Sequence, residues 1–389
     1  MRRRSRLGSD QHWTTLSIAL VDNRPCCPAS STTGFADFES TKTETIHDVK
    51  TLLLSEPGHF ERTQTEEPGA PADAHATVRI HRVGICGTDL HAFNGRQPFF
   101  AYPRILGHEL GAEVVAIGDD VQHLAVGDHV AVEPYLECGT CQPCRSGRYN
   151  CCESLRVLGV HTDGGMREII DMPAIKLHRS EELELEQLAL VETLGIGAHA
   201  VGRAGIQAGE AVLVVGAGPI GLATAQFARL AGCRVHLLEL DAGRRGFAEA
   251  HFDITASLTP GVDGPATVGD LRQHLGGDLP TCVFDCTGYH ASMETSLAFP
   301  ASGGRLVFVG FQLEKIHFEN PEFHRRELSL LASRNSTATE FRRILALMES
   351  GEVDTTPWIT HRASYDDVVE IFGSWLAPES GVVKAMVSF

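Results

Sequence analysis

Residues 212–221, VLVVGAGPIG, constrain the fold of this chain most strongly, because they carry a buried apolar strand through a glycine turn into a helix. Gly216 permits the tight turn, Gly218 lets a pyrophosphate approach the backbone, and Gly221 lets the helix pack on the strand. A second apolar strand, RVHLLEL, ends at Glu239, where a carboxylate can accept ribose hydroxyls. This arrangement predicts a dinucleotide-binding site on a parallel sheet. The alternative is an ordinary glycine turn with a surface glutamate.

The coenzyme is expected to be NAD rather than NADP, because the Glu239 carboxylate repels a 2′-phosphate. Arg244 argues the other way but lies beyond the end of the strand, and Asp241 can share the ribose contacts. The segment DCTG, residues 285–288, ends a later strand that faces the same crevice. The predicted coenzyme contacts are Gly216, Gly218, Pro219, Ile220, Gly221, Glu239, Asp241, Arg244 and Thr287.

Three regions of the chain differ in pattern. Apolar strands alternate with helical segments over residues 196–334, which predicts an α/β domain with a doubly wound parallel sheet. Residues 49–195 begin with short β-rich runs separated by Gly, Pro and Asp turns, the pattern of a small all-β unit. The tail, residues 335–389, no longer alternates in this way. At 389 residues the chain is long enough for two ordinary domains.

The first 48 residues begin with MRRRSR and continue with polar stretches such as PASSTTG. Because they show little hydrophobic periodicity, we expect them to form a poorly ordered extension. Val49 is then a candidate initiator of the chain. An organellar transit peptide and a weak signal sequence are the less favoured alternatives.

The net charge of −17 argues against a nucleic-acid or anionic-membrane partner, because both need clustered Lys and Arg. No apolar run approaches the roughly 20 residues that cross a bilayer. We therefore expect a cytoplasmic protein with a small-molecule partner.

Four cysteines, at positions 138, 141, 144 and 152, follow the form C-x-x-C-x-x-C with a fourth thiol further on. Short C-x-x-C spacings let thiolates converge on one ion, and four sulfurs make a closed tetrahedral site. Cys138, Cys141, Cys144 and Cys152 therefore predict a structural zinc rather than a disulfide framework or a redox centre. Cys151 is adjacent and is an alternative to Cys152.

Cys86, His108 and Glu192 are each unremarkable alone: a buried thiol, a core histidine and a carboxylate on a helix. Together they supply the incomplete ligand set of a catalytic zinc that keeps a position for water or substrate. The remaining histidines, His161 among them, are interpreted as structural.

The motifs GICGTDLH, GHELGAEVV, CGTCQPCRSGRYNCC and GAGPIG, in this order, resemble those of the zinc-dependent medium-chain alcohol dehydrogenase family. The chain is most similar to the polyol and sugar-acid branch, which includes sorbitol dehydrogenases and L-galactonate or L-gulonate 5-dehydrogenases. Where that branch usually has Pro after the glutamate, this chain has Thr193. The resemblance implies a GroES-like catalytic domain from residues 49–195 and 335–389, a Rossmann coenzyme domain from residues 196–334, and a homodimer or homotetramer.

The resemblance also assigns roles to individual residues. Cys86 and His108 match catalytic zinc ligands, and Glu109 and Glu192 are both candidates for the carboxylate ligand. The matches for the remaining roles are Thr88 and His91 in a proton relay, Asp89 as the residue that orients the histidine, and Arg334 near the substrate. Arg104 and Asn94 are expected to complete a polar substrate pocket with Glu192 and Arg334.

These assignments predict zinc- and NAD-dependent oxidation of a secondary alcohol of a polyol or sugar acid to a ketone, with two zinc ions per chain. One alternative is an L-threonine 3-dehydrogenase. Another is a non-catalytic NAD-binding homologue that keeps only the structural zinc.

Overall fold

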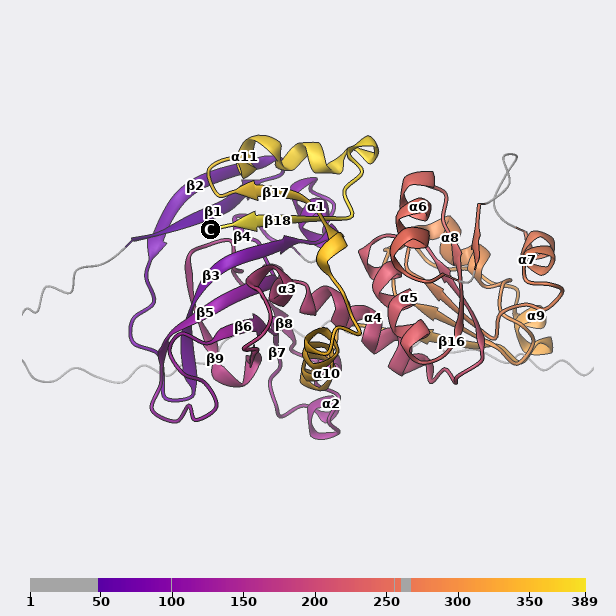
Figure 1. Ribbon diagram of the computed structural model, residues 1–389, viewed down its shortest axis with the longest axis horizontal. Helices are drawn as coiled ribbons and strands as arrows, with labels where there is room; N and C mark the ends of the chain where they lie inside the picture. The colour runs from indigo at the N-terminus through magenta and orange to yellow at the C-terminus, as the bar shows by residue number, and fades with distance from the viewer. Residues whose placement is uncertain (1–47, 99, 255, 260–266) are drawn as a thin grey trace, which may run out of the picture. The chain divides into compact units, whose positions relative to one another are not determined.

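The computed structural model describes residues 48–98, 100–254, 256–259 and 267–389 (Figure 1). The predicted N-terminal extension lies, except for Asp48, outside the described residues. Among the described helices, none is long and apolar enough to cross a membrane.

A six-stranded parallel sheet occupies the region that was predicted to alternate between strands and helices. Its strand order is β13-β12-β11-β14-β15-β16, which is the 3-2-1-4-5-6 order of a Rossmann fold. The strands are β11 (Ala211–Val215), β12 (Arg234–Leu238), β13 (Ala256–Leu258), β14 (Cys282–Asp285), β15 (Arg305–Phe308) and β16 (Ser329–Ala332). The helices of this region are α5 (Pro219–Leu230), α6 (Ala242–His251), α7 (Val268–His274), α8 (His290–Ser296) and α9 (Asn320–Arg325). The predicted α/β fold is confirmed.

Both faces of this sheet are buried, as parallel strands require. Along β11, Val212 and Val214 pack into the cluster that contains α5, whereas Leu213 and Val215 pack into a second cluster with Leu271 of α7. The run of apolar residues in the sequence therefore reflects a strand that is covered on its two sides.

Two further sheets form the β-rich region. Strands β1 (Asp48–Glu56), β2 (His59–Glu66) and β4 (Arg104–Ile105) pair in the order β2-β1-β4. A larger sheet runs β10-β6-β5-β3-β18-β17, with β9 also paired to β3. Its strands are β3 (His75–Ile85), β5 (Glu109–Ile117), β6 (His129–Val132), β9 (Ile169–Pro173), β10 (Leu177–Arg179), β17 (Ile359–Ser364) and β18 (Lys384–Ser388). Because β18 pairs with β3, the C-terminal tail and the N-terminal β region share one sheet (Figure 1).

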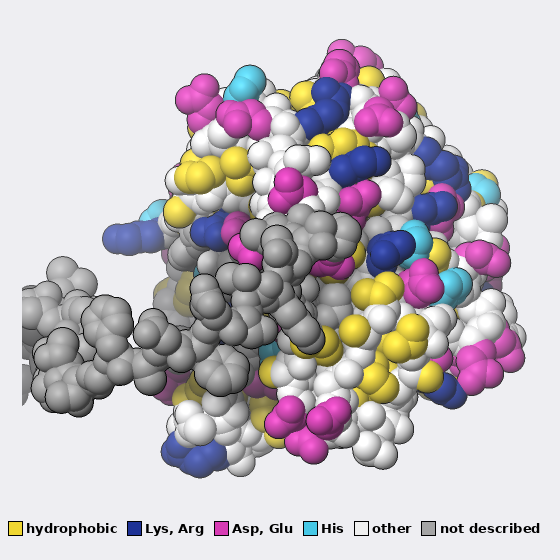
Figure 2. Space-filling model, turned by 90° about the vertical axis from the view of Figure 1, so that its left-hand side faces the viewer, with side chains coloured by type: hydrophobic (Ala, Val, Ile, Leu, Met, Phe, Trp, Pro, Cys, Tyr) yellow, Lys and Arg dark blue, Asp and Glu magenta, His cyan; other side chains and the backbone are white. Residues whose placement is uncertain are grey.

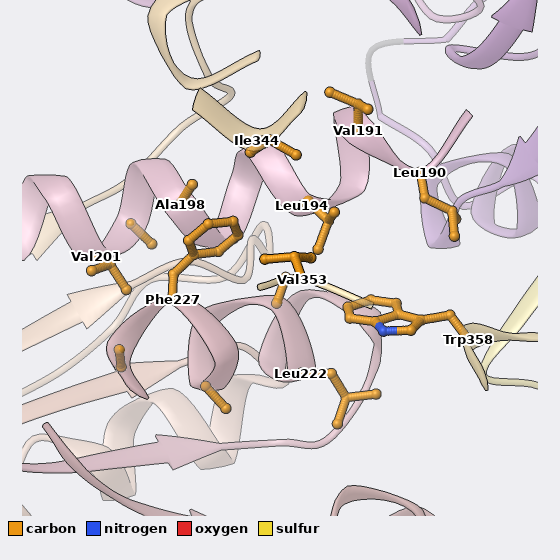
Figure 3. Close-up of a cluster of buried hydrophobic side chains, with 14 of the residues drawn as sticks. Leu190, Val191, Leu194, Ala198, Val201, Leu222, Phe227, Ile344, Val353 and Trp358 are labelled. Atoms are coloured by element: carbon orange, nitrogen blue, oxygen red, sulfur yellow. The ribbon is translucent and has the colours of Figure 1, made fainter. Parts of the chain in front are cut away.

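Helix α4 (Val191–Ala204) carries Glu192 in its first turn and is held by close packing against α5. A Cβ added at Gly197 would lie 2.5 Å from the backbone of α5, so a side chain at this crossing has no room. Figure 3 shows Ala198 and Val201 of α4 next to Phe227 of α5, in a buried cluster. The helix ends at Gly205, whose positive φ of 61° suits glycine.

The remaining elements are short or lie around these sheets. They are α1 (Gly87–Phe93), α2 (Gln142–Arg145), α3 (Leu185–Ala189), α10 (Ala338–Glu349), α11 (Val368–Ile371), β7 (Tyr135–Leu136) and β8 (Arg156–Val157), with 3-10 turns η1 (Tyr149–Cys151), η2 (Ala174–Lys176), η3 (Thr356–Trp358), η4 (Phe372–Leu376) and η5 (Pro378–Ser380). On the face shown in Figure 2, acidic and basic side chains of the described residues are interspersed.

Candidate active site and metal centres

Cys86, His108 and Glu109 come together at one end of the paired strands β3 and β5. Cys86 follows β3 and precedes α1, His108 precedes β5, and Glu109 begins β5. One ligand atom from each residue lies within 4.8 Å of the other two, and both His108 and Glu109 are buried. Gly84 pairs with Glu109 across the strands, and a Cβ there would lie 2.3 Å from Glu109 Oε2. A glycine is therefore needed beside this carboxylate.

Asp89 joins the two predicted ligands Cys86 and His108. Its Oδ2 accepts the Cys86 N–H at 2.9 Å, and its Oδ1 lies 3.7 Å from His108 Nδ1. Burial alone would lower the pKa of His108, but the neighbouring Asp89 carboxylate and Cys86 raise that pKa well above its usual value. Burial raises the pKa of Asp89. Asp89 therefore faces the Nδ1 side of the His108 ring, and Cys86 also interacts with this histidine.

Glu109 is paired with a buried lysine that the sequence analysis did not single out. Lys384 Nζ lies 2.7 Å from both carboxylate oxygens and 3.1 Å from Thr193 Oγ1. Lys384 is 1% exposed, so the ion pair is shielded from solvent. The available signal was a lysine inside an otherwise apolar strand, GVVKAMVSF.

Glu192 is buried close to this group but is not within the 4.8 Å set. Its carboxylate accepts a hydrogen bond from the Tyr135 hydroxyl, and it interacts electrostatically with His108. Burial and, next, the Glu192 carboxylate raise the pKa of Tyr135 well above its usual value. Of the two glutamates predicted as ligand candidates, Glu109 is therefore the one that lies with Cys86 and His108.

This donor set fits a catalytic zinc. A thiolate sulfur, an imidazole nitrogen and a carboxylate oxygen are the ligands that zinc prefers, and three protein ligands leave a position open. Within the described residues, His108 Nδ1 and Asp89 Oδ1 are buried without a hydrogen-bond partner of good geometry. A metal that oriented the imidazole would bring these two atoms into a hydrogen bond.

The four-cysteine cluster also fits zinc. Cys141 Sγ lies 3.4 Å from Cys144 Sγ and 3.8 Å from Cys152 Sγ, and all four sulfurs are within 4.8 Å of one another. Zn–S bonds of about 2.3 Å in a tetrahedron separate the sulfurs by about 3.8 Å, whereas a disulfide needs about 2 Å. Backbone N–H groups of Thr140 and Cys141 lower the pKa of Cys138 to about 6. Cys152 belongs to the cluster, and Cys151 is exposed beside it.

A third group, His290, Glu294 and His317, lies on α8 and the segment after β15. One oxygen of Glu294 already accepts the backbone N–H and faces the ring nitrogen of His317, both at 2.9 Å, and lies 3.3 Å from His290 Nε2. These contacts explain the cluster as a hydrogen-bonded link between helix and loop.

The glycine turn has the geometry of a phosphate-binding loop. Gly216 has a φ of 95°, and a Cβ at Gly221 would lie 1.8 Å from the Gly216 carbonyl oxygen. A Cβ at Gly218 would meet no described atom within 4 Å, so this side of the turn is open for a ligand. Pro219 and Ile220 begin α5, whose N–H groups point toward the turn.

Glu239 holds this turn in place through its two carboxylate oxygens. Oε2 accepts the Ala217 N–H at 2.6 Å, and Oε1 accepts the Asp241 N–H at 2.8 Å. Asp241 caps α6 by accepting the Arg244 N–H, and the Arg244 side chain is exposed. Thr287 donates its hydroxyl to Asp285 at 2.6 Å. Glu239 thus adds a structural role to the ribose contact that the sequence predicts.

The predicted relay and substrate residues differ in how far their side chains are exposed to solvent. Thr88 is half-buried on α1, whereas His91 and Asn94 are exposed further along the same helix and at its end. Arg104 lies in β4, and Arg334 is exposed after β16.

His161 interacts electrostatically with two of the predicted substrate residues, Arg334 and Arg104. Burial first, and then the charges of Arg334 and Arg104, lower the pKa of His161. The loop that carries His161 is anchored beside His108, because Gly164 N and Gly165 N donate to backbone carbonyls of residues 105 and 107. Arg104 donates to Asp163 at 3.0 Å, and its Nε is buried with no partner among the described atoms. Two guanidinium groups, those of Arg104 and Arg334, therefore lie near the loop that is anchored beside His108. The sequence alone predicts a structural role for His161, because no motif surrounds it.

Comparison with known proteins gives consistent matches. The family model of the alcohol dehydrogenase GroES-like domain matches residues 72–182, and that of the zinc-binding dehydrogenase matches residues 219–350. L-galactonate-5-dehydrogenase of Escherichia coli (strain K12) is 38% identical over 343 residues, which cover 88% of this chain and 99% of that protein.

Two solved structures have the same fold. A protein of Sinorhizobium meliloti 1021, described as a zinc-binding dehydrogenase and bound to NADP, is 31% identical with a TM-score of 0.80, covering 88% of this chain and all of that one. The rspB alcohol dehydrogenase of Escherichia coli CFT073, complexed with NADH, is 28% identical with a TM-score of 0.81, covering 88% of this chain and 99% of that one.

Proposed function

This chain belongs to the zinc-binding alcohol dehydrogenase family, and from that membership we propose that it transfers a hydride from a secondary alcohol of a sugar acid to NAD, forming a ketone. The family resemblance and the enzyme class expected from the motifs are confirmed by these matches. A sugar acid agrees with the name of the Escherichia coli relative, L-galactonate-5-dehydrogenase.

Cys86, His108 and Glu109 would hold the catalytic zinc, with Glu192 beside it. Zinc, when bound, supplies Lewis-acid polarisation of the reacting hydroxyl. Asp89 orients the His108 ring through the contact of 3.7 Å to Nδ1, and Lys384 compensates the charge of Glu109 at 2.7 Å. The protein thus fixes the ligands before the substrate arrives.

Thr88 and His91 would carry the substrate proton to solvent. Thr88 is half-buried, and His91 is exposed one helical turn further along α1. The hydroxyl would accept the alcohol proton while donating its own toward the imidazole, which would pass a proton on to water. NAD, when bound, would accept the hydride from the carbon that bears the reacting hydroxyl, so the products would be a ketone, NADH and a proton.

One observation carries the choice of an acid over a neutral polyol: the Arg104 and Arg334 guanidinium groups both act on His161, in the loop whose backbone is anchored beside His108. The buried Nε of Arg104 has no partner within the described part of the chain, and a substrate carboxylate would supply one.

Turnover of matched substrates tests this proposal. L-galactonate and galactitol differ at the carboxylate, so we expect a higher kcat/KM for the acid, with L-gulonate, sorbitol and L-threonine completing the panel and NADP as the alternative coenzyme. Replacing Arg104 by Gln should raise KM for L-galactonate about 10- to 100-fold, because a hydrogen bond to a charged group is lost, and should affect galactitol far less. Arg148→Gln, at an exposed site, is the control. Equal use of galactitol, or preferred turnover of L-threonine, would reject the acid.

The finer assignments rest on the same proposal. We assign two zinc ions per chain, NAD in preference to NADP, a homodimer or homotetramer, and a cytoplasmic location. The division into residues 49–195 with 335–389 and residues 196–334 is proposed as two domains, supported by the sheet that β18 completes.

A further inference from the structure

The cysteine loop, residues 138–152, and the strand β7 just before it contact one face of α4 at two points. Tyr135, three residues before the first cysteine of the cluster, donates its hydroxyl to Glu192. Asn150, within the loop, contacts His199 Nε2 at 3.0 Å through its Nδ2. Glu192 and His199 are seven residues apart, which is about two helical turns and therefore the same face of α4.

The base of the loop fixes the backbone of Tyr135. Strands β7 and β8 pair Tyr135 with Val157, and Leu158 N donates to the Pro134 carbonyl at 3.0 Å. The Cys138 N–H lies 3.3 Å from Cys152 Sγ, so the cluster closes the loop just after β7.

Tyr135 and the cluster share one core with α4. Tyr135, Cys144 and Cys152 belong to the same buried group as Val191 and Leu194. Tyr135 is 3% exposed and Glu192 6%, so water does not replace their contact easily.

The second contact reaches the proposed substrate site. The Nδ2 group of Asn150 also donates to the Arg334 carbonyl at 3.0 Å, and His199 Nδ1 contacts Glu340 of α10 at 2.9 Å. The cysteine loop therefore contacts both the helix that carries Glu192 and the segment that carries Arg334.

We propose that Tyr135 is a positioning residue of the active site, through which the metal-bound cysteine loop fixes the Glu192 carboxylate beside the catalytic zinc. This inference rests on the proposed function, because it takes Glu192 to face the metal held by Cys86 and His108. The four-cysteine cluster then has a role in catalysis in addition to stabilising its own loop. Tyr135 donates its hydroxyl proton to the Glu192 carboxylate, and this hydrogen bond is the contact that would hold the carboxylate in place.

Tyr135→Phe tests the inference because it keeps the ring in the core and removes the hydroxyl. The control is Tyr149→Phe, in the same loop at a side chain that is 46% exposed. Steady-state kinetics give kcat and the KM values for NAD and L-galactonate. Denaturant unfolding gives the midpoint, and metal analysis gives the zinc content. The visible spectrum of the cobalt-substituted protein reports on the geometry around the metal. The cobalt bands of the catalytic site are those that Cys86→Ala removes.

We expect Tyr135→Phe to lower kcat about tenfold or more and to shift the cobalt bands, because Glu192 loses a hydrogen bond to a charged group. The KM for NAD, the zinc content and the midpoint should stay close to those of Tyr149→Phe. If turnover falls only in parallel with lost zinc and a lower midpoint, the role of Tyr135 is structural and the inference is overturned.

Glu192→Gln separates failure of this inference from failure of the proposed site. If Glu192→Gln loses turnover while Tyr135→Phe matches Tyr149→Phe in kcat and cobalt bands, the inference is wrong and the proposed function stands. If Glu192→Gln keeps wild-type turnover and bands, Glu192 does not serve the catalytic zinc, and both the assignment of Glu192 and the inference built on it fail.

Discussion

The buried ammonium of Lys384 shows how a single distant residue supports the proposed zinc site. It is 275 positions from Glu109 in sequence and contacts both oxygens of that carboxylate. Removing one member of a buried ion pair leaves the other charge without compensation. This residue is therefore important for stability as well as for the geometry of the site.

In the zinc-free protein, Lys384→Met should lower the free energy of unfolding by about 3–5 kcal/mol, because Glu109 then remains buried as an unpaired charge. Lys50, whose side chain is 59% exposed near Glu168, provides the comparison. Lys50→Met should cost about 1 kcal/mol or less. Denaturant unfolding of the two variants measures the difference, and equal midpoints would show that the Lys384 pair is not significant for stability.

The buried imidazole of His236 should make the stability of the folded protein depend on pH. Burial, followed by the nearby His274 and Arg234, lowers the pKa of His236 to about 4. The unfolded chain binds a proton on this imidazole below about pH 6.5, whereas the folded protein binds it only near pH 4, so stability falls as the pH decreases through this window. At pH 5 the loss from this group is about 2 kcal/mol relative to neutral pH.

His236→Gln should therefore lose less stability than the wild type between pH 7.5 and pH 5, which thermal unfolding at the two values measures. The same replacement at the exposed His59 is the control for the substitution itself. If His236→Gln and the wild type respond equally to acid, His236 is not protonated on unfolding in this range.

Among single residues, those within short local motifs could be predicted from the sequence, because Cys86 and His108 lie in characteristic segments. Lys384, Tyr135 and His161 could not, because they reach the site through strand pairing and loop packing between distant segments. The choice between Glu109 and Glu192 also needed the structure, since both lie in suitable motifs and only their distances from Cys86 and His108 distinguish them.

At the scale of elements, the turn between β11 and α5 separates two functions of glycine. Gly221 allows close packing inside the turn, whereas Gly218 faces open space. Gly218 has φ −71° and ψ 177°, which any residue adopts, so alanine there strains nothing in the backbone. The two positions should therefore respond differently to the same substitution.

Gly218→Ala should raise the Kd for NAD about tenfold or more with an unchanged unfolding midpoint, because its methyl group occupies the space for the pyrophosphate. Gly221→Ala should lower both affinity and midpoint, because its Cβ overlaps the Gly216 carbonyl. Gly202→Ala, at an exposed position of α4, controls for the substitution itself. Calorimetric titration with NAD measures these constants, and normal binding by Gly218→Ala would reject the predicted phosphate site.

For the elements, alternation of strands and helices was sufficient to predict the parallel sheet over residues 196–334. The sequence could not predict how the strands of the larger sheet are ordered, because that depends on which apolar faces meet after folding. Pairing of β18 with β3 is the clearest example, since about 300 residues separate the two strands.

At the scale of the whole molecule, two clusters of candidate metal ligands and a glycine-rich turn lie in a chain of the zinc-binding alcohol dehydrogenase family. The family match over both halves of the chain supports this combination. The proposed division of labour is that the four-cysteine cluster stabilises its loop and orients α4, while Cys86, His108 and Glu109 hold the metal that acts on the substrate.

Turnover by Cys86→Ala is the most direct test of this central claim, measured with the best acid substrate of the wild type. We expect activity to fall by about a thousandfold, because several kcal/mol of transition-state stabilisation depend on the metal. Zinc should fall from about two ions to about one per chain, and NAD should still bind. A Cys86→Ala protein that keeps wild-type turnover would contradict the assignment of Cys86 to a catalytic zinc.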